Sequence, residues 1–105
     1  IPTSYVYARL ELSHREITVL CNMAYPVIAF TDRPRPYMSH EFIEMPAIAD
    51  LFAAVSFHTV PIGTLRAHPD PWLATMNAGE NEYFRYQMRY WGIRQIGDFV
   101  FNDWD

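Results

Sequence analysis

Hydrophobic and polar residues alternate in the first part of the chain, and an alternation with period two predicts half-buried β-strands. From Ser4 to Leu12, the apolar positions expected to face the core are Val6, Ala8, Leu10 and Leu12. After a short polar break the alternation resumes, and the second inward set is Ile17, Val19, Cys21 and Met23. Two such strands in succession predict a β-hairpin. Residues 27–30 are apolar on both faces, as expected for a central strand.

The middle of the chain begins with two prolines in residues 32–36, which predict a loop because proline lacks an amide donor. Ser39 is a suitable N-cap for a following helix, whose first turn would hold Glu41 and Glu44. Pro46 is expected to kink or restart that helix. Beyond it, an apolar stripe at helical spacing consists of Ile48, Leu51, Phe52 and Val55.

Two helices are predicted in the second half of the chain. Asp70 as N-cap and Pro71 at the first helical position start a short helix, which Gly79 closes. Residues 80–91 form a longer helical pattern that ends at Gly92.

A strand is expected before and after this pair of helices. Residues 57–66 have a strand pattern that Pro61 and Gly63 weaken, so an edge position or a bulge is expected. Residues 93–101 predict the last strand. The sequence therefore predicts an α+β fold, with a mainly antiparallel sheet of about five strands and two to three helices on one face. One compact domain over residues 1–105 is expected, because half of the residues are hydrophobic and 19% are charged.

Composition narrows the possible partners and location. The net charge is −4 and all eight basic residues are arginines, so the basic face that phosphate-backbone binding requires is not expected. Nucleic acid is therefore an unfavoured partner. No apolar run approaches the ~20 residues that cross a bilayer, so no membrane span is predicted. The single cysteine, Cys21, is expected in the core. Because one cysteine cannot form an intramolecular disulfide, a reducing, cytoplasmic setting is predicted.

The segment over residues 80–91 is the strongest candidate for a binding surface. Its apolar arc is wider than one sheet face needs, because a stripe of tyrosines lies beside the stripe expected to face the core. The arc is compatible with a core stripe plus half-exposed tyrosines, with a self-associating surface, or with the wall of a ligand pocket. The predicted surface consists of Tyr83, Tyr86, Tyr90, Trp91, Arg85 and Arg89.

Candidates for acid–base chemistry are scattered along the chain, and no motif joins them. They are His58, His68, Asp70 and Asp98. His40 and Glu44 stand four residues apart on the predicted helix, but the second imidazole of a zinc-protease motif is missing, so no metal and no cofactor are expected. Arg33 and Arg35 would either grip an anion or belong to a solvated connection.

Three classes of function follow. The first is a non-catalytic accessory domain that forms a homodimer and binds itself, a protein partner or a small apolar ligand through its aromatic surface. The second is a small enzyme with a His/Asp acid–base pocket between sheet and helices. The third is single-strand binding, with bases stacked on the tyrosines beside Arg85 and Arg89.

Overall fold

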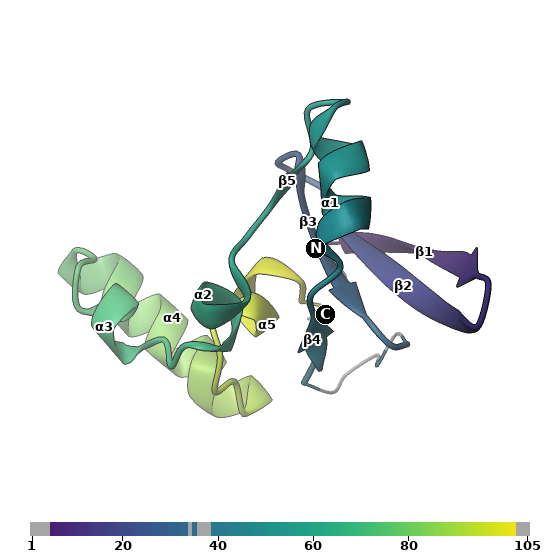
Figure 1. Ribbon diagram of the computed structural model, residues 1–105. Helices are drawn as coiled ribbons and strands as arrows, with labels where there is room; N and C mark the ends of the chain where they lie inside the picture. The colour runs from purple at the N-terminus through teal and green to yellow at the C-terminus, as the bar shows by residue number, and fades with distance from the viewer. Residues whose placement is uncertain (1–4, 34, 36–38, 103–105) are drawn as a thin grey trace.

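The computed structural model describes residues 5–33, 35 and 39–102, and these residues confirm the α+β class (Figure 1). A mostly antiparallel sheet of five strands is combined with five short helices. The strands are β1 (Tyr5–Leu12), β2 (Arg15–Asn22), β3 (Val27–Thr31), β4 (Phe42–Ile43) and β5 (His58–Thr59). The helices are α1 (Pro46–Ala53), α2 (Ile62–Arg66), α3 (Asp70–Leu73), α4 (Ala78–Trp91) and α5 (Gly97–Val100).

The sheet has the strand order β1-β2-β3-β4, and every pairing along this path is antiparallel. The predicted hairpin is confirmed: Leu12 pairs with Arg15 across the turn that joins β1 to β2. β5 pairs with β3 in parallel, beginning at Val27 opposite His58. β3 is therefore the central strand that the run of apolar residues predicted.

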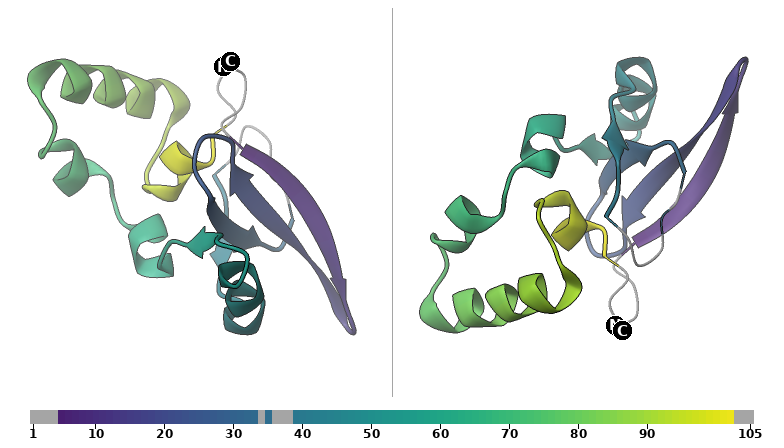
Figure 2. Two further views of the ribbon diagram at one scale, coloured as in Figure 1. Left: turned by 90° about the horizontal axis from the view of Figure 1, so that it is seen from above. Right: turned by 90° about the horizontal axis from the view of Figure 1, so that it is seen from below.

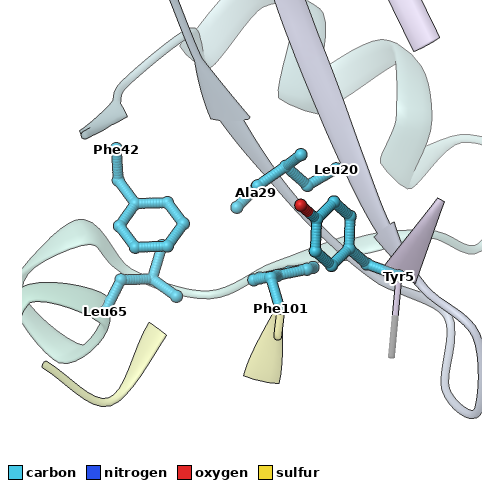
Figure 3. Packing of buried hydrophobic residues seen from close by; sticks show 6 residues of the cluster. All are labelled: Tyr5, Leu20, Ala29, Phe42, Leu65 and Phe101. Carbon is cyan, nitrogen blue, oxygen red and sulfur yellow. The ribbon is translucent and has the colours of Figure 1, made fainter. Parts of the chain in front are cut away.

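The core is divided between the two faces of the sheet. On one face lies the first cluster, which Figure 3 shows converging from the strands, α2 and the C-terminal segment. It consists of Tyr5, Leu20, Ala29, Phe42, Leu65 and Phe101. On the other face, the second cluster packs against α1 and consists of Ile17, Val19, Ile28 and Phe30. Helices thus cover both faces of the sheet, and not one face as the sequence predicted.

The prediction of which residues of the first two strands face the core is wrong at the ends far from the hairpin turn. Tyr5 is buried and Val6 is 54% exposed, the reverse of the expected order. The ring of Tyr5 lies edge-on to that of Phe101, with centroids 6.4 Å apart, so the C-terminal segment covers the face that was expected to be exposed. Met23 lies beyond the end of β2 and is exposed. Ser4 lies outside the described residues.

The prediction of a helix starting at Ser39 is wrong. Phe42 is almost fully buried and pairs with Thr31, so this segment forms β4 and helix α1 begins only at Pro46. Of the predicted stripe, Ile48 and Phe52 pack against the second cluster, whereas Leu51 is 71% exposed. Val55 lies beyond the end of α1 and is also exposed.

The second half of the chain is more helical than predicted. Within residues 57–66 only His58–Thr59 is a strand, because Ile62–Arg66 forms α2. The short helix starts at Asp70 itself, with Pro69 in the N-cap position, so the predicted cap is one residue off. Gly79 does not close that helix but lies inside α4. The last predicted strand, residues 93–101, is wrong, since Gly97–Val100 forms α5.

The molecule is elongated. Its extents are 47 × 25 × 22 Å, and its radius of gyration of 14.2 Å exceeds the value of about 13 Å expected for a chain of this length. Figures 1 and 2 show α3 and α4 at one end and the β1–β2 hairpin at the other. The accessible surface of 6830 Å² likewise exceeds the roughly 6100 Å² typical of a monomer of this mass.

Candidate functional site

Helix α4 is fixed at both ends by its own sequence. The side chain of Asn77 caps the N-terminus by accepting a hydrogen bond from the amide of Glu80 at 2.9 Å. At the other end Gly92 adopts a left-handed conformation with φ of 68°, which ends the helix as predicted. Glu80 in the first turn and Arg89 in the last turn suit the helix dipole. The helix therefore forms where the sequence predicted it, starting two residues earlier.

The inner side of α4 rests on a cluster of three aromatic rings. The centroid of Phe84 lies 5.7 Å from that of Trp72 and 5.6 Å from that of Phe99, and those of Trp72 and Phe99 are 5.4 Å apart. These rings join α4 to α3 and α5. Even so, no residue of this 14-residue helix is buried, which is unusual for a helix in a folded domain, since burial of one face normally stabilises it.

The outer side of α4 carries three exposed tyrosines on one face. Tyr83, Tyr86 and Tyr90 are 54%, 56% and 67% exposed. The rings of Tyr86 and Tyr90 are stacked, with centroids 6.1 Å apart, and Tyr90 lies edge-on to Trp91 at 5.0 Å. Trp91 itself is half-buried and its indole N–H donates to Oε1 of Gln87 at 2.9 Å. The tyrosines form what we call the tyrosine face: Tyr83, Tyr86 and Tyr90.

Two of the three charged residues near the tyrosine face lie beside it, and the third is engaged elsewhere. Glu82 and Arg89 are exposed beside it, and within the described part of the chain neither forms an ion pair. Arg85 points elsewhere. Its Nε donates to Oδ1 of Asn81 at 2.9 Å and its Nη1 lies 3.1 Å from Oδ1 of Asp70. Of the two arginines predicted for the surface, only Arg89 lies beside the tyrosines.

Of the four acid–base candidates, the structure brings together His68 and Asp70. Their side chains are 3.5 Å apart, from Nδ1 to Oδ2, but neutral His68 uses the same Nδ1 to accept the amide of Asp70 at 3.2 Å. Only a protonated ring would pair with the carboxylate. With Arg85 on its other oxygen, Asp70 joins α3 to α4, and both His68 and Asp70 are more than half exposed. These three side chains therefore form a surface-exposed polar contact between α3 and α4.

The other two candidates lie in different surroundings. His58 is exposed in β5, where its amide donates to the carbonyl of Pro26 at 2.9 Å. Asp98 is buried, and it accepts the Ser39 hydroxyl at 2.6 Å and the His40 amide at 3.1 Å. Gln95 completes this network by donating to Asp98 at 3.1 Å and to the carbonyl of His40 at 2.7 Å.

The imidazole of His40 lies beside this network and is buried. Its Nε2 donates to the carbonyl of Phe101 at 2.8 Å, and its Nδ1 has no hydrogen-bond partner among the described residues. The network of Ser39, Gln95 and Asp98 therefore holds the C-terminal segment against the strand β4. Asp98 was among the candidates named from the sequence, but its partners were not. Ser39 is 59 residues away from it, and Gln95, although only three residues away, belongs to no motif that marks it as a donor.

The residues considered for a metal ion or an anion lie in or near the segment ahead of β4. His40 is buried ahead of β4 and does not share a helix with Glu44, because the helix predicted over this segment does not form. Among the described residues, no group of three or more His, Cys, Asp or Glu side chains is placed to hold a metal ion. Arg35 pairs with Glu41 at 3.4 Å, which leaves Arg33 as the exposed guanidinium of that loop. Pro34 and Pro36 lie outside the described residues.

Two hollows lie near α1. One, of about 310 Å³, lies between β3, α1 and the segment leading into α2, and includes Glu44 and Asp50. The other, of about 410 Å³, is an apolar groove between β1 and α1. Neither contains the tyrosine face or an acid–base candidate. None of the described helices is long and apolar enough to span a bilayer.

The fold and the site together define an α+β domain with an exposed aromatic helix. Comparisons with known protein families, with curated proteins and with solved structures found no match to this chain.

Proposed function

We propose that this chain is a non-catalytic interaction domain that self-associates through the tyrosine face of α4. The observation that carries the proposal is a 14-residue helix without one buried residue, on which three tyrosines are each more than half exposed. Tyrosine buries a large rigid area at little loss of conformational entropy and is enriched at interface hot spots. A second molecule seated on α4 would give this helix the burial that its own chain does not provide.

The charges beside the tyrosine face favour a second copy as the occupant. Glu82 lies toward the N-terminus of α4 and Arg89 toward its C-terminus, and both are exposed on the same side. If two α4 helices pack antiparallel, with the two-fold axis near Tyr86, Glu82 of each copy meets Arg89 of the other. An isologous contact needs this kind of self-complementary pattern. Tyr83 of one copy would then lie near Tyr90 of the other.

The remaining surface chemistry agrees with a binding role. Tyr86 and Tyr90 are already stacked in the single chain, so part of the conformational entropy of ordering their side chains has been lost before binding. The elongated shape leaves more surface exposed than a compact monomer of this mass has. A partner protein or a small apolar ligand on the tyrosine face is the alternative occupant, and the location we propose is the reducing cytoplasm, on the basis of the single cysteine.

The alternative, a His/Asp acid–base enzyme, has less support. His68 and Asp70 are the candidates that lie within reach of each other, and they lie on an exposed turn with Asp70 engaged by Arg85. Asp98 is buried and its carboxylate accepts three donors. General acid–base catalysis needs a proton that can be exchanged with a bound substrate.

The test is sedimentation of the double variant Tyr86→Ser/Tyr90→Ser against Tyr25→Ser. Tyr25 is 70% exposed but lies on the turn between β2 and β3, so it controls for loss of any exposed tyrosine. We expect the α4 variant to keep the far-UV circular dichroism of the native chain. It should associate at least about tenfold more weakly, because truncating a hot-spot aromatic costs about 2 kcal/mol or more, and about 1.4 kcal/mol is a tenfold change in the dissociation constant. Unchanged association of the α4 variant would refute self-association through this face. Binding of an added protein or ligand without self-association would favour the alternative occupants.

A further inference from the structure

The strand β1 is an edge strand with one open side. It pairs along all eight of its residues with β2, and among the described residues no strand pairs with its other side. An open edge presents unpaired amide and carbonyl groups to a second strand. The turn between Leu12 and Arg15 holds two residues, so Leu12 and Arg15 form a hydrogen-bonded pair and the pairs alternate from there. The backbone groups of Arg9 and Glu11 consequently point toward the open edge.

The side chains at these two positions carry an unbalanced charge. Glu11 lies directly opposite Glu16 on β2, and like charges placed opposite each other destabilise a sheet. Arg9 is the nearby cation, with its Nη1 3.8 Å from Oε1 of Glu16. This ion pair engages Glu16, and among the described residues Glu11 forms none. A further arginine beside Glu11 would balance the charges on this face of the hairpin.

An apolar groove adjoins the same strand on the other face of the sheet. It has a volume of about 410 Å³ and lies between the end of β1 and the helix α1. Leu51 and Val55, which line it, are 71% and 63% exposed. Large exposed aliphatic side chains beside an open edge are a feature that folded monomers usually avoid.

We propose that β1 pairs antiparallel with β1 of a second copy of this chain, about a two-fold axis at Leu10. In this register Arg9 of each copy lies opposite Glu11 of the other, and each pair exchanges both backbone hydrogen bonds through groups that already point outward. The two sheets become continuous across the axis. Opposite residues of an antiparallel pair share a face, so the two apolar grooves come to lie on the same face on either side of the axis.

The charge pattern selects this register over its neighbours. A shift that moves the axis to Arg9 would place the two Arg9 side chains opposite each other, which is repulsive. A shift by a single residue would place residues of one copy, whose backbone groups point outward, opposite residues of the other copy whose backbone groups are already bonded to β2. Among these registers, only the axis at Leu10 places an arginine opposite Glu11. The occupant of the edge is therefore another copy of the same strand.

This contact is separate from the one proposed for α4. β1 and α4 lie at opposite ends of the elongated molecule (Figure 2). A chain with two self-complementary faces at its ends assembles beyond the dimer. The β1 contact does not depend on the α4 contact, and it is best measured where the tyrosine face has been removed.

The test uses the variant Tyr86→Ser/Tyr90→Ser as the parent and adds R9E or E11R to it. We expect the parent to form dimers and each charge variant alone to associate at least tenfold more weakly, because like charges then face each other in both pairs. An equimolar mixture of the two variants should form a heterodimer with the parent's affinity, since opposite charges face each other again. Sedimentation of the parent, the single variants and the mixture gives all of these results.

The outcomes distinguish the two contacts. A parent that is monomeric at millimolar concentration, or charge variants whose mixture stays monomeric, would overturn the β1 pairing and leave the α4 contact standing. A parent that associates as strongly as the native chain but loses this on R9E would refute the α4 contact and support β1. If a charge variant does not fold, an isotope-mixed sample of the parent decides: a contact between the Leu10 α-protons of two copies supports the register, and its absence in a dimer overturns it.

Discussion

At the residue scale, Gly97 shows how closely the C-terminal helix approaches the sheet. A Cβ placed on Gly97 would overlap the ring of Phe42 and come within 3.1 Å of the carbonyl oxygen of Leu65. Both neighbours belong to the first cluster and are buried. Glycine is required here by space, because α5 could not otherwise lie against β4 and α2.

The first prediction concerns this close approach. Gly97→Ala should lower the free energy of unfolding by about 1–3 kcal/mol, the usual range for overpacking a rigid interior. The matched control is Gly63→Ala in α2, where a Cβ would meet nothing within 4 Å. That change should leave stability equal or raise it by up to about 1 kcal/mol, because alanine favours helices. Urea unfolding of both variants measures the difference, and equal stabilities would contradict the packing described for α5.

Individual burial was hard to predict where distant segments cover a strand. Tyr5 was expected on the exposed side of β1, but the rings of Phe101 and His40 lie edge-on to it. Alternation along one strand shows which residues share a face, and it does not show which distant segment covers that face. The tyrosines of α4 were predictable as a group, because helical spacing alone puts them on one face.

At the scale of elements, α4 was predicted well because its signals are local. Gly92 supplies the left-handed residue that ends it, as predicted. The cap Asn77 is also a neighbour in sequence, but the prediction placed it in the preceding helix and started α4 two residues late. The strand β4 and the helix α5 depend on distant contacts instead. Phe42 pairs with Thr31, and Asp98 accepts donors from Ser39 and His40. Short apolar runs fit either strand or helix until such contacts decide.

The second prediction tests the local signal. Asn77→Ala should destabilise the protein by about 1 kcal/mol, because the amide of Glu80 loses its side-chain acceptor at the N-terminus of α4. Asn77→Ser keeps an acceptor in the same place and should stay within a few tenths of a kcal/mol of the native chain. Thermal unfolding monitored by circular dichroism measures both. Equal losses in the two variants would mean that the cap does not stabilise α4.

At the scale of the whole molecule, the two proposed contacts lie at opposite ends of a 47 Å long chain. The helical end offers the tyrosine face and the sheet end offers the open edge of β1 (Figure 1). Each contact is isologous, so two-fold axes alternate along any assembly that uses both. The weight-average mass should therefore keep rising with concentration past that of a dimer.

The most direct test of the central claim is disulfide trapping on α4. In a Cys21→Ser background, Tyr86→Cys places a thiol at the proposed axis, whereas Tyr83→Cys places it three residues away. Two thiols at the axis meet within disulfide reach, but thiols three residues off are separated by about 9 Å along antiparallel helices. Mild oxidation should therefore convert Tyr86→Cys to a covalent dimer and leave Tyr83→Cys largely without a cross-link, as non-reducing electrophoresis would show. No cross-linking at either position, or equal cross-linking at both, would contradict an antiparallel pair of α4 helices.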